Sequence, residues 1–390
     1  MGSAVETASE TNRRPHGRLV NCPGGYRAYV PFPLPPPLTW EQELTVCLSP
    51  ADRAIGELAA EGRRLPNPQL LLRPFVRKEA VLSSRIEGTQ TTLEELLAAE
   101  AGAAGVHGSA DLREVANYVT ALEYGLERLK TLPVSLRLVR ELHEALMRGV
   151  RGDVATPGEF RRSQNWIGPP GCTLNEATYV PPPPADIMAC LDAWERFLHN
   201  DALPPLIHAG LAHAQFEAIH PFLDGNGRVG RLLITLLLIE REIISSPLLY
   251  LSAFFETTQD EYYARLLGVT ARGAWEEWLT YFLRGIALQS QDAVERIRRI
   301  DHHFSRWKQE MARGRSQLPV RALDLFAENP FWTVGGVAGR LEVAFTTAQR
   351  ALDRLEAAGI VSQVGRRRRN RVYRAEKILS VLEEPLRLAK

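Results

Sequence analysis

The chain has 390 residues, enough for two or three domains with sizeable cores. Its 47 Lys and Arg residues nearly balance its 46 Asp and Glu residues, which excludes polyanion binding through overall charge and leaves local basic patches open. No apolar run reaches the length of about 18 residues that a membrane span needs, and the N-terminus has no apolar signal-peptide core, so we expect no membrane contact.

The first 38 residues are expected to form a disordered tail and a proline-rich arm. Residues 1–15 are polar, which predicts a disordered tail. Residues 16–38 are rich in glycine and proline and end in Pro35-Pro36-Pro37, which predicts an extended, partly polyproline II segment. Such a segment is either a proline-rich ligand or an arm laid across its own domain, and we favour the arm.

Helical patterns begin at Trp40 and continue to Gly62, and a second helix is predicted from Leu70 to Glu87. Gly88 follows it as a natural helix-ending residue. A Thr-x-x-Glu capping box from Thr91 to Glu94 predicts the start of a third helix.

After a small-residue linker at 102–108, further helices are predicted at 112–130, 135–150, 186–199 and 205–219. Three histidines lie on these helices and are interpreted as packing or capping groups, because zinc would need more ligands: His143, His208 and His213. Between residues 158 and 184, two short β-like pieces flank a loop rich in Gly, Pro and Asn, which predicts a hairpin with an irregular tip.

The stretch His-Pro-Phe-Leu-Asp-Gly-Asn-Gly-Arg-Val-Gly-Arg occupies residues 220–231 and predicts a phosphate site. Gly225 and Gly227 can adopt positive φ and expose backbone N–H groups to an anion. The apolar run 229–239 predicts a buried helix, so the loop leads into a helix N-terminus that favours phosphate. Arg228 and Arg231 are three residues apart and share one face of the first turn, which suits a polyphosphate.

Two residues of this stretch are suited to chemistry rather than to phosphate binding. Asp224 precedes the glycines, where a hard oxygen ligand for Mg²⁺ is expected. His220 ends the preceding helix and is placed to act as a general base.

Helices are predicted at 275–289 and 290–313, and a different module begins at Leu318. Its pattern of three helices and a basic two-stranded hairpin predicts a winged helix-turn-helix, with Arg366–Arg369 in the wing. Thr346, Thr347, Gln349 and Arg350 would begin its recognition helix. DNA is the favoured partner, and docking to a protein or dimerisation is the alternative.

The four cysteines, Cys22, Cys47, Cys172 and Cys190, have no metal or disulfide spacing. They are interpreted as reduced thiols of a cytoplasmic protein.

Residues 220–231 match the Fic signature His-Pro-Phe-x-Asp/Glu-Gly-Asn-Gly-Arg-x-x-Arg at every fixed position, so the chain resembles Fic-domain proteins. That resemblance implies a protein adenylyltransferase, which moves AMP from ATP to a Ser, Thr or Tyr hydroxyl of a target protein. It implies His220 as the catalytic base, Asp224 as the Mg²⁺ ligand, and the glycine loop with Asn226 as the α-phosphate cradle. The residues expected to bind ATP are Glu87, Asp224, Gly225, Asn226, Gly227, Arg228, Val229, Gly230, Arg231 and Tyr263.

The resemblance also gives a meaning to the end of the second predicted helix. Ser83 and Glu87-Gly88 match the inhibitory Ser/Thr-x-x-x-Glu-Gly/Asn motif of the family, in which the glutamate pairs with the second signature arginine, here Arg231. Glu87 would then occupy the place of the γ-phosphate, and its tethering would give it a high effective concentration. The predicted hairpin resembles the family's target-aligning flap, which implies roles for Ile167, Gly168 and Tyr179.

We therefore expect a mainly α fold, with a Fic-type helical bundle, a small β-hairpin flap and a C-terminal winged helix-turn-helix. The expected regions are a tail and arm at 1–38, an N-terminal helical region at 39–110, a Fic catalytic domain at 111–290, a connector helix at 291–315 and the winged helix at 316–380.

The favoured function is Mg-ATP-dependent adenylylation of a target protein, or of the chain itself, held back by Glu87. Two alternatives stay open. The same site could remove AMP, or the chain could be a DNA-binding regulator whose Fic domain senses nucleotide. The expected partners are ATP, an unnamed target protein, DNA through the winged helix, and a second copy in a homodimer.

Overall fold

The structure is a computed structural model that describes residues 13–386 except 15, 41, 65–67, 103–108, 151–155, 315 and 365–370. The chain forms two compact units. Unit 1 consists of Met1–Asp52, Thr120–Ile243 and Thr258–Ile286, and unit 2 consists of Arg53–Val119, Ile244–Thr257 and Ala287–Lys390. Helices α1 (Gln42–Arg64), α4 (Ala110–Arg128) and α11 (Trp275–Ala312) contribute residues to both units.

Unit 1 begins with a small antiparallel sheet of β1 (Arg13–Arg14), β2 (Gly17–Asn21) and β3 (Arg27–Pro31), in that order. The extended segment predicted for residues 16–38 is therefore paired as a hairpin between 17 and 31, a pairing that the sequence did not predict. The turn contains Gly24 and Gly25, whose φ angles of 100° and 83° are left-handed values that glycine adopts without strain. The proline-rich run begins only at the end of β3, so the missing proline N–H groups leave most of the ladder intact.

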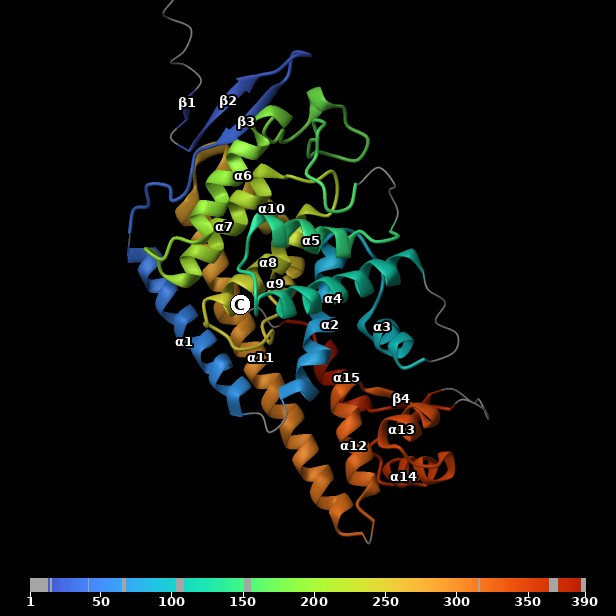
Figure 1. The fold of residues 1–390 in the computed structure, drawn as a ribbon. Coiled ribbons are helices and arrows are strands. Elements are labelled where there is room, and N and C mark those ends of the chain that lie inside the picture. Colours follow the sequence, from blue (N-terminus) through green and yellow to red (C-terminus); the bar gives the residue numbers. More distant parts are fainter. Residues whose placement is uncertain are drawn as a thin grey trace, which may run out of the picture. The chain divides into compact units, whose positions relative to one another are not determined.

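The core of unit 1 is helical (Figure 1). Its remaining elements are α5 (Leu136–Leu146), the short 3₁₀ helix η2 (Leu174–Glu176), α6 (Pro184–Leu198), α7 (Pro205–Ile219), α8 (Asn226–Glu240) and α10 (Gln259–Arg272). Helix α7 packs against α6, α8 and α10. Nearly every residue of α7 and α8 is buried, because both helices are apolar on all sides. The segment 220–225 that joins them is therefore fixed at both ends.

Unit 2 is built around α2 (Pro68–Ile86), which packs on α3 (Leu93–Glu100) and α9 (Ser252–Thr257). Glu79 of α2 is only 4% exposed, and its carboxylate accepts hydrogen bonds from the Ser252 amide at 3.1 Å and the Tyr118 hydroxyl at 3.3 Å. These bonds compensate the burial of a charge and hold α2 in one position.

The capping box of α3 lies one residue later than the sequence predicted. The Thr92 hydroxyl accepts from the Glu95 amide at 3.1 Å, and the Glu95 carboxylate accepts from the Thr92 amide at 2.8 Å. Thr91 is buried, whereas Thr92 has the extended conformation of a helix N-cap. Two adjacent threonines followed by two glutamates made both registers possible in the sequence.

The C-terminal part of unit 2 contains α12 (Leu318–Glu328), β4 (Phe331–Thr333), α13 (Val334–Leu341), α14 (Phe345–Ala357), β5 (Ser362–Val364), β6 (Val372–Arg374) and α15 (Glu376–Glu383). The strands form an antiparallel sheet in the order β4–β6–β5, and α12 packs on α2. Thr333 caps α13 by accepting a hydrogen bond from the Gly336 amide at 2.9 Å. The wing residues Arg366–Arg369 lie outside the described residues, and the winged-helix assignment with its DNA partner stays a prediction.

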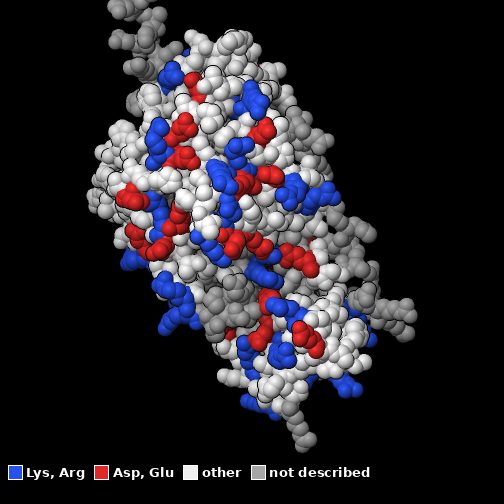
Figure 2. All heavy atoms as spheres, viewed as in Figure 1, with Lys and Arg blue, Asp and Glu red and all other residues white. Residues whose placement is uncertain are grey.

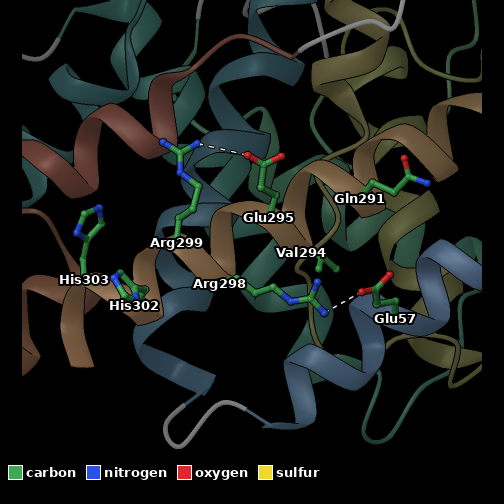
Figure 3. A pocket seen from close by; sticks show the side chains of 8 residues that line it. All are labelled: Glu57, Gln291, Val294, Glu295, Arg298, Arg299, His302 and His303. Atoms are coloured by element: carbon green, nitrogen blue, oxygen red, sulfur yellow. Dashed lines mark hydrogen bonds and ion pairs between the residues drawn. The ribbon is translucent and has the colours of Figure 1, made fainter. Parts of the chain in front are cut away.

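Helix α11 corrects a second prediction, because residues 275–312 form one helix rather than two. The segment contains no proline, and its second half buries an apolar face while carrying ion pairs on its charged side. In unit 2, Arg298 pairs with Glu57 of α1 at 2.8 Å beside a hollow of about 480 Å³ (Figure 3). Arg299 pairs with Glu295 at 3.8 Å and more closely with Glu384 at 2.6 Å.

None of the described helices combines the length and apolar character needed to cross a bilayer. Figure 2 shows Lys and Arg side chains interspersed with Asp and Glu over the face it draws, in keeping with the balanced composition.

Candidate active site

His220 stands at the junction between α7 and the signature loop. It has the left-handed angles φ 49° and ψ 60°, which non-glycine residues rarely adopt. Its backbone carbonyl accepts hydrogen bonds from Arg161 Nε at 2.9 Å and Asn165 Nδ2 at 3.4 Å, so neighbouring side chains hold this backbone in place. Its ring Nδ1 lies 3.3 Å from the Glu217 carbonyl oxygen. A carbonyl oxygen can only accept a hydrogen bond, so Nδ1 carries the ring proton. This contact leaves Nε2 as the proton-accepting nitrogen.

The loop then enters α8 through Gly225, the N-cap of that helix. Gly225 has φ 79°, and a Cβ atom there would lie 3.0 Å from Met147 Sδ. The backbone conformation therefore favours glycine, and a side chain would also have to displace Met147 slightly. No side chain caps the helix. Its first-turn amides, from Asn226 onward, therefore lie at a helix N-terminus of the kind that favours an anion, and phosphate binding there stays a prediction.

The shape of the loop is fixed from inside by Asn226 and His143. Asn226 is 2% exposed; its Oδ1 accepts from the Phe222 amide at 2.8 Å and its Nδ2 donates to the Phe222 carbonyl at 2.8 Å. His143 stacks on the Phe222 ring at 3.7 Å, accepts from the Gly158 amide at 2.9 Å, and lies 3.1 Å from the Asp224 carbonyl. Burial lowers the pKa of His143 to about 4, so the ring is neutral and its Nε2–H donates to Asp224.

The two signature arginines are both buried, at 3% exposure for Arg228 and 2% for Arg231. Arg228 Nη2 lies 3.5 Å from Asp224 Oδ1 and 3.7 Å from Met147 Sδ. The Asp224 side chain is 56% exposed, so its carboxylate is open to a hydrated cation. The neighbouring residues Gly227, Val229 and Gly230 also belong to the first turns of α8.

Arg161 fastens the predicted flap to this loop. It is 3% exposed and also donates to the carbonyls of Ser163 at 3.1 Å and Pro182 at 2.6 Å, while its amide bonds the Pro221 carbonyl at 2.9 Å. Burial lowers the pKa of Arg161 to about 10, which leaves the guanidinium charged at neutral pH. The planar guanidinium therefore bonds the two borders of the flap, at Ser163 and Pro182, to the backbone of His220.

The flap itself is a hairpin closed by one antiparallel bridge between Ile167 and Tyr179, with N···O distances of 2.9 and 3.0 Å. The Tyr179 hydroxyl donates to the Ala218 carbonyl on α7 at 2.6 Å, which anchors the returning segment. Ile167 is 41% exposed, and Gly168 next to it is exposed as well. The predicted flap residues therefore lie together, two of them accessible from solvent.

The predicted inhibitory motif ends α2 in unit 2. Ser83 is buried, Glu87 is exposed in the turn after Ile86, and Gly88 has φ 97°. Arg85 of the same helix end lies 3.5 Å from Glu256. Glu87 belongs to unit 2 and Arg231 to unit 1, and a salt bridge between them stays a prediction.

Tyr263, the predicted adenine contact on α10, is 46% exposed, and its role in binding adenine stays a prediction. Its neighbour Tyr262 is only 1% exposed. The histidines interpreted as packing groups are indeed buried: His143, His208 and His213.

Sequence reasoning assigned no site role to Arg161, Asn165 or His143, yet all three bond the backbone of residues 220–224. Single residues 55 to 81 positions away carry no spacing pattern. The only available signal was the run of polar residues at the borders of a predicted hairpin.

Comparison with known proteins gives matches over the same segments. Residues 46–127 match the family model described as "Fic/DOC family N-terminal", and residues 133–238 match the "Fic/DOC family" model. A curated relative named "Protein adenylyltransferase Fic" from Drosophila virilis is 32% identical over 155 residues, which cover 39% of this chain and 29% of the relative. The protein of the same name from Drosophila melanogaster is 31% identical over 155 residues, covering 39% of this chain and 28% of the relative.

The fold agrees with a crystal structure of a Fic family protein from Desulfovibrio desulfuricans. That likeness has a TM-score of 0.58 at 21% sequence identity and covers 88% of this chain and 98% of the other. It confirms the mainly helical fold class predicted from the sequence. Residues 46–127 and 133–238 of this chain therefore form a Fic/DOC N-terminal region followed by a Fic/DOC domain.

Proposed function

We propose that the chain is a protein adenylyltransferase that moves AMP from ATP to a hydroxyl group of a Ser, Thr or Tyr residue in a target protein. The observation that carries the proposal is the pairing of an oriented base with an anion site. His220, with Nε2 as its proton acceptor, begins the short loop that leads to the glycine-capped N-terminus of α8, whose first turns carry two buried arginines. The relatives named protein adenylyltransferase support the same activity.

In this mechanism His220 Nε2 takes the proton of the target hydroxyl. The hydroxyl oxygen forms a bond to the α-phosphorus as the bond between that phosphorus and the bridging oxygen breaks, and pyrophosphate leaves. First-turn amides of α8 stabilise negative charge on the α-phosphate. The Asn226 side chain keeps the loop in shape, because both its polar atoms are bonded to Phe222. Arg228 and Arg231 would hold the β- and γ-phosphates.

Magnesium fits this donor set only together with nucleotide. The described residues contain no group of three His, Cys, Asp or Glu side chains that could hold a metal. Mg²⁺ is commonly bound through one or two carboxylates plus substrate phosphates, and the exposed Asp224 carboxylate supplies one. Bound there, the ion would neutralise charge on the phosphates.

The flap and the inhibitory motif complete the proposal. The exposed Ile167-Gly168 segment would align an extended target segment beside His220, with Arg161 and Tyr179 keeping the flap in position. Glu87, on the turn that ends α2, would compete with the γ-phosphate for Arg231 and keep the resting enzyme nearly inactive. The four free thiols support a reducing, cytoplasmic setting.

The test is to incubate Glu87→Gly protein with ATP labelled in the α-phosphate and Mg²⁺, beside wild type and the double variant Glu87→Gly/His220→Ala. We expect label on protein mainly in the single variant, and a loss of about 10²-fold or more without the base. ATP labelled in the γ-phosphate should give no label, which distinguishes AMP transfer from phosphorylation. Absence of α-label with every target offered, although nucleotide binds, would overturn the proposal.

A further inference from the structure

Behind Arg231, in unit 1, lies a buried chain of hydrogen bonds that the mechanism above does not use. His213 on α7 is 2% exposed, and Tyr262 on α10 is 1% exposed. His213 Nδ1 lies 3.0 Å from the Gly230 carbonyl, and its Nε2 lies 2.8 Å from the Tyr262 hydroxyl. The Tyr262 hydroxyl also receives a hydrogen bond from the Arg231 guanidinium.

The direction of each hydrogen bond follows from what each atom can do. The Gly230 carbonyl only accepts, so His213 Nδ1 carries the proton and Nε2 must accept from the Tyr262 hydroxyl. Burial lowers the pKa of His213 to about 3, which keeps the ring neutral and able to accept. Burial likewise raises the pKa of Tyr262 well above its usual range, so the hydroxyl keeps its proton. Tyr262 therefore donates to His213 and offers its lone pair to Arg231.

The packing around this chain of hydrogen bonds is tight. A Cβ atom at Gly230 would lie 2.4 Å from Glu217 Oε1 and 3.3 Å from His213 Cε1. The His213 ring also stacks on Trp278 at 5.8 Å, and Tyr262 lies 6.1 Å from the same indole. Three helices therefore fix the hydroxyl against which the Arg231 guanidinium rests.

A fixed acceptor of this kind has a consequence for ligand recognition. An arginine side chain loses considerable rotamer entropy when it is ordered by a ligand. If Tyr262 already orders the guanidinium, phosphate binding avoids that cost, and the gain applies only to a phosphate that reaches Arg231.

We propose that His213 and Tyr262 are positioning residues that orient the Arg231 guanidinium and thereby make the site prefer nucleoside triphosphates over diphosphates. The proposal rests on the function given above, in which Arg231 binds the γ-phosphate. Neither residue touches the reacting atoms.

The test measures the dissociation constants of Mg-ATP and Mg-ADP by calorimetry, in full-length Glu87→Gly protein as reference. Tyr262→Phe in that background should weaken ATP binding roughly tenfold and leave ADP binding within about twofold, since charged hydrogen bonds carry effects of that size. Unchanged ADP affinity also shows that the variant is folded. His213→Leu should act in the same direction, because it removes the acceptor that orients the Tyr262 hydroxyl.

Tyr281→Phe is the matched control. Tyr281 is 2% exposed and belongs to the same aromatic cluster, and its hydroxyl lies 2.8 Å from Thr258 Oγ1. It should keep the ATP-over-ADP preference of the reference. Retention of that preference in Tyr262→Phe and His213→Leu would overturn the proposal, and so would its retention in Arg231→Ala. If the Glu87→Gly reference prefers ATP over ADP and the variants lose that preference, but the reference transfers no AMP from labelled ATP, only the proposed function is overturned.

Discussion

At the scale of single residues, the site depends on side chains that never meet the substrate. Arg161 is the clearest example, because one guanidinium satisfies three carbonyls, those of His220, Ser163 and Pro182, at 2.6 to 3.1 Å. Lysine has a single ammonium group at the end of a flexible stem and cannot reproduce this planar fork. The left-handed backbone of His220 would then lose its main support.

We therefore expect Arg161→Lys to lower the free energy of unfolding by roughly 2–4 kcal/mol, since it leaves buried acceptors unsatisfied. AMP transfer in the Glu87→Gly background should fall at least about tenfold, because a small displacement of a catalytic base is costly. Arg162→Lys is the matched control: the Arg162 side chain is 89% exposed, and within the described part of the chain its ion-pair partner is Glu159, at 3.5 Å. Urea unfolding and the α-label assay measure both effects, and equal behaviour of the two variants would contradict this role for Arg161.

The residue scale also marks the limit of prediction from sequence. His220, Asp224 and both arginines could be predicted as neighbours from the signature alone. They lie within twelve residues and share one loop and the start of one helix. Arg161, His143 and Tyr262 reach the same loop or arginine through the tertiary fold. No periodicity connects them to it, and a lone histidine on an apolar helix has the same appearance whether it fills space or orders a loop.

At the scale of elements, the central feature is the entry into α8. Gly225→Ala places a side chain at φ 79°, which costs about 1–2 kcal/mol, and also brings Cβ to 3.0 Å from Met147 Sδ. The loop must shift to relieve both, so the helix N-terminus moves away from the phosphates. We expect ATP affinity to fall about tenfold or more, measured by calorimetry.

Gly56→Ala on α1 controls for the substitution itself. A Cβ atom at Gly56 meets nothing within 4 Å, so alanine should stabilise the helix by up to about 1 kcal/mol without changing nucleotide affinity. Equal ATP affinity in the two variants would show that the conformation of Gly225 does not shape the site.

Elements with strong periodicity were predicted well, whereas one hairpin, whose strands are defined by pairing, was missed. The helix at 205–219 was predicted to the residue, because proline precedes it and apolar residues fill it. The β2–β3 hairpin was missed, since its short strands are followed by a proline-rich run that suggested an arm. The break predicted inside α11 was also wrong, because the change from apolar to charged composition at about residue 290 left the helix period intact.

At the scale of the whole molecule, stability should depend on pH through three buried histidines of unit 1. Burial lowers the pKa of His143 and His208 to about 4 and that of His213 to about 3, whereas the unfolded chain titrates near 6.5. Between pH 6.5 and pH 4 the unfolded state therefore binds more protons than the folded state. Their contribution to stability is complete above about pH 6.5 and is lost as the pH falls toward 4.

Each such histidine contributes a slope of up to about 1.4 kcal/mol per pH unit in that window, so the three together rival the net stability of an ordinary domain. We expect the free energy of unfolding in urea to be level from pH 8 to pH 7 and to fall steeply below pH 6.5.

His143→Gln can keep both bonds of the ring, to the Gly158 amide and the Asp224 carbonyl, but cannot be protonated. Because carboxylates titrate alike in both proteins, the difference between the two slopes isolates His143. A slope shallower by about 1 kcal/mol per pH unit is expected for the variant. Equal slopes would mean that His143 binds a proton in the folded protein and that its ring does not hold the signature loop as a neutral donor.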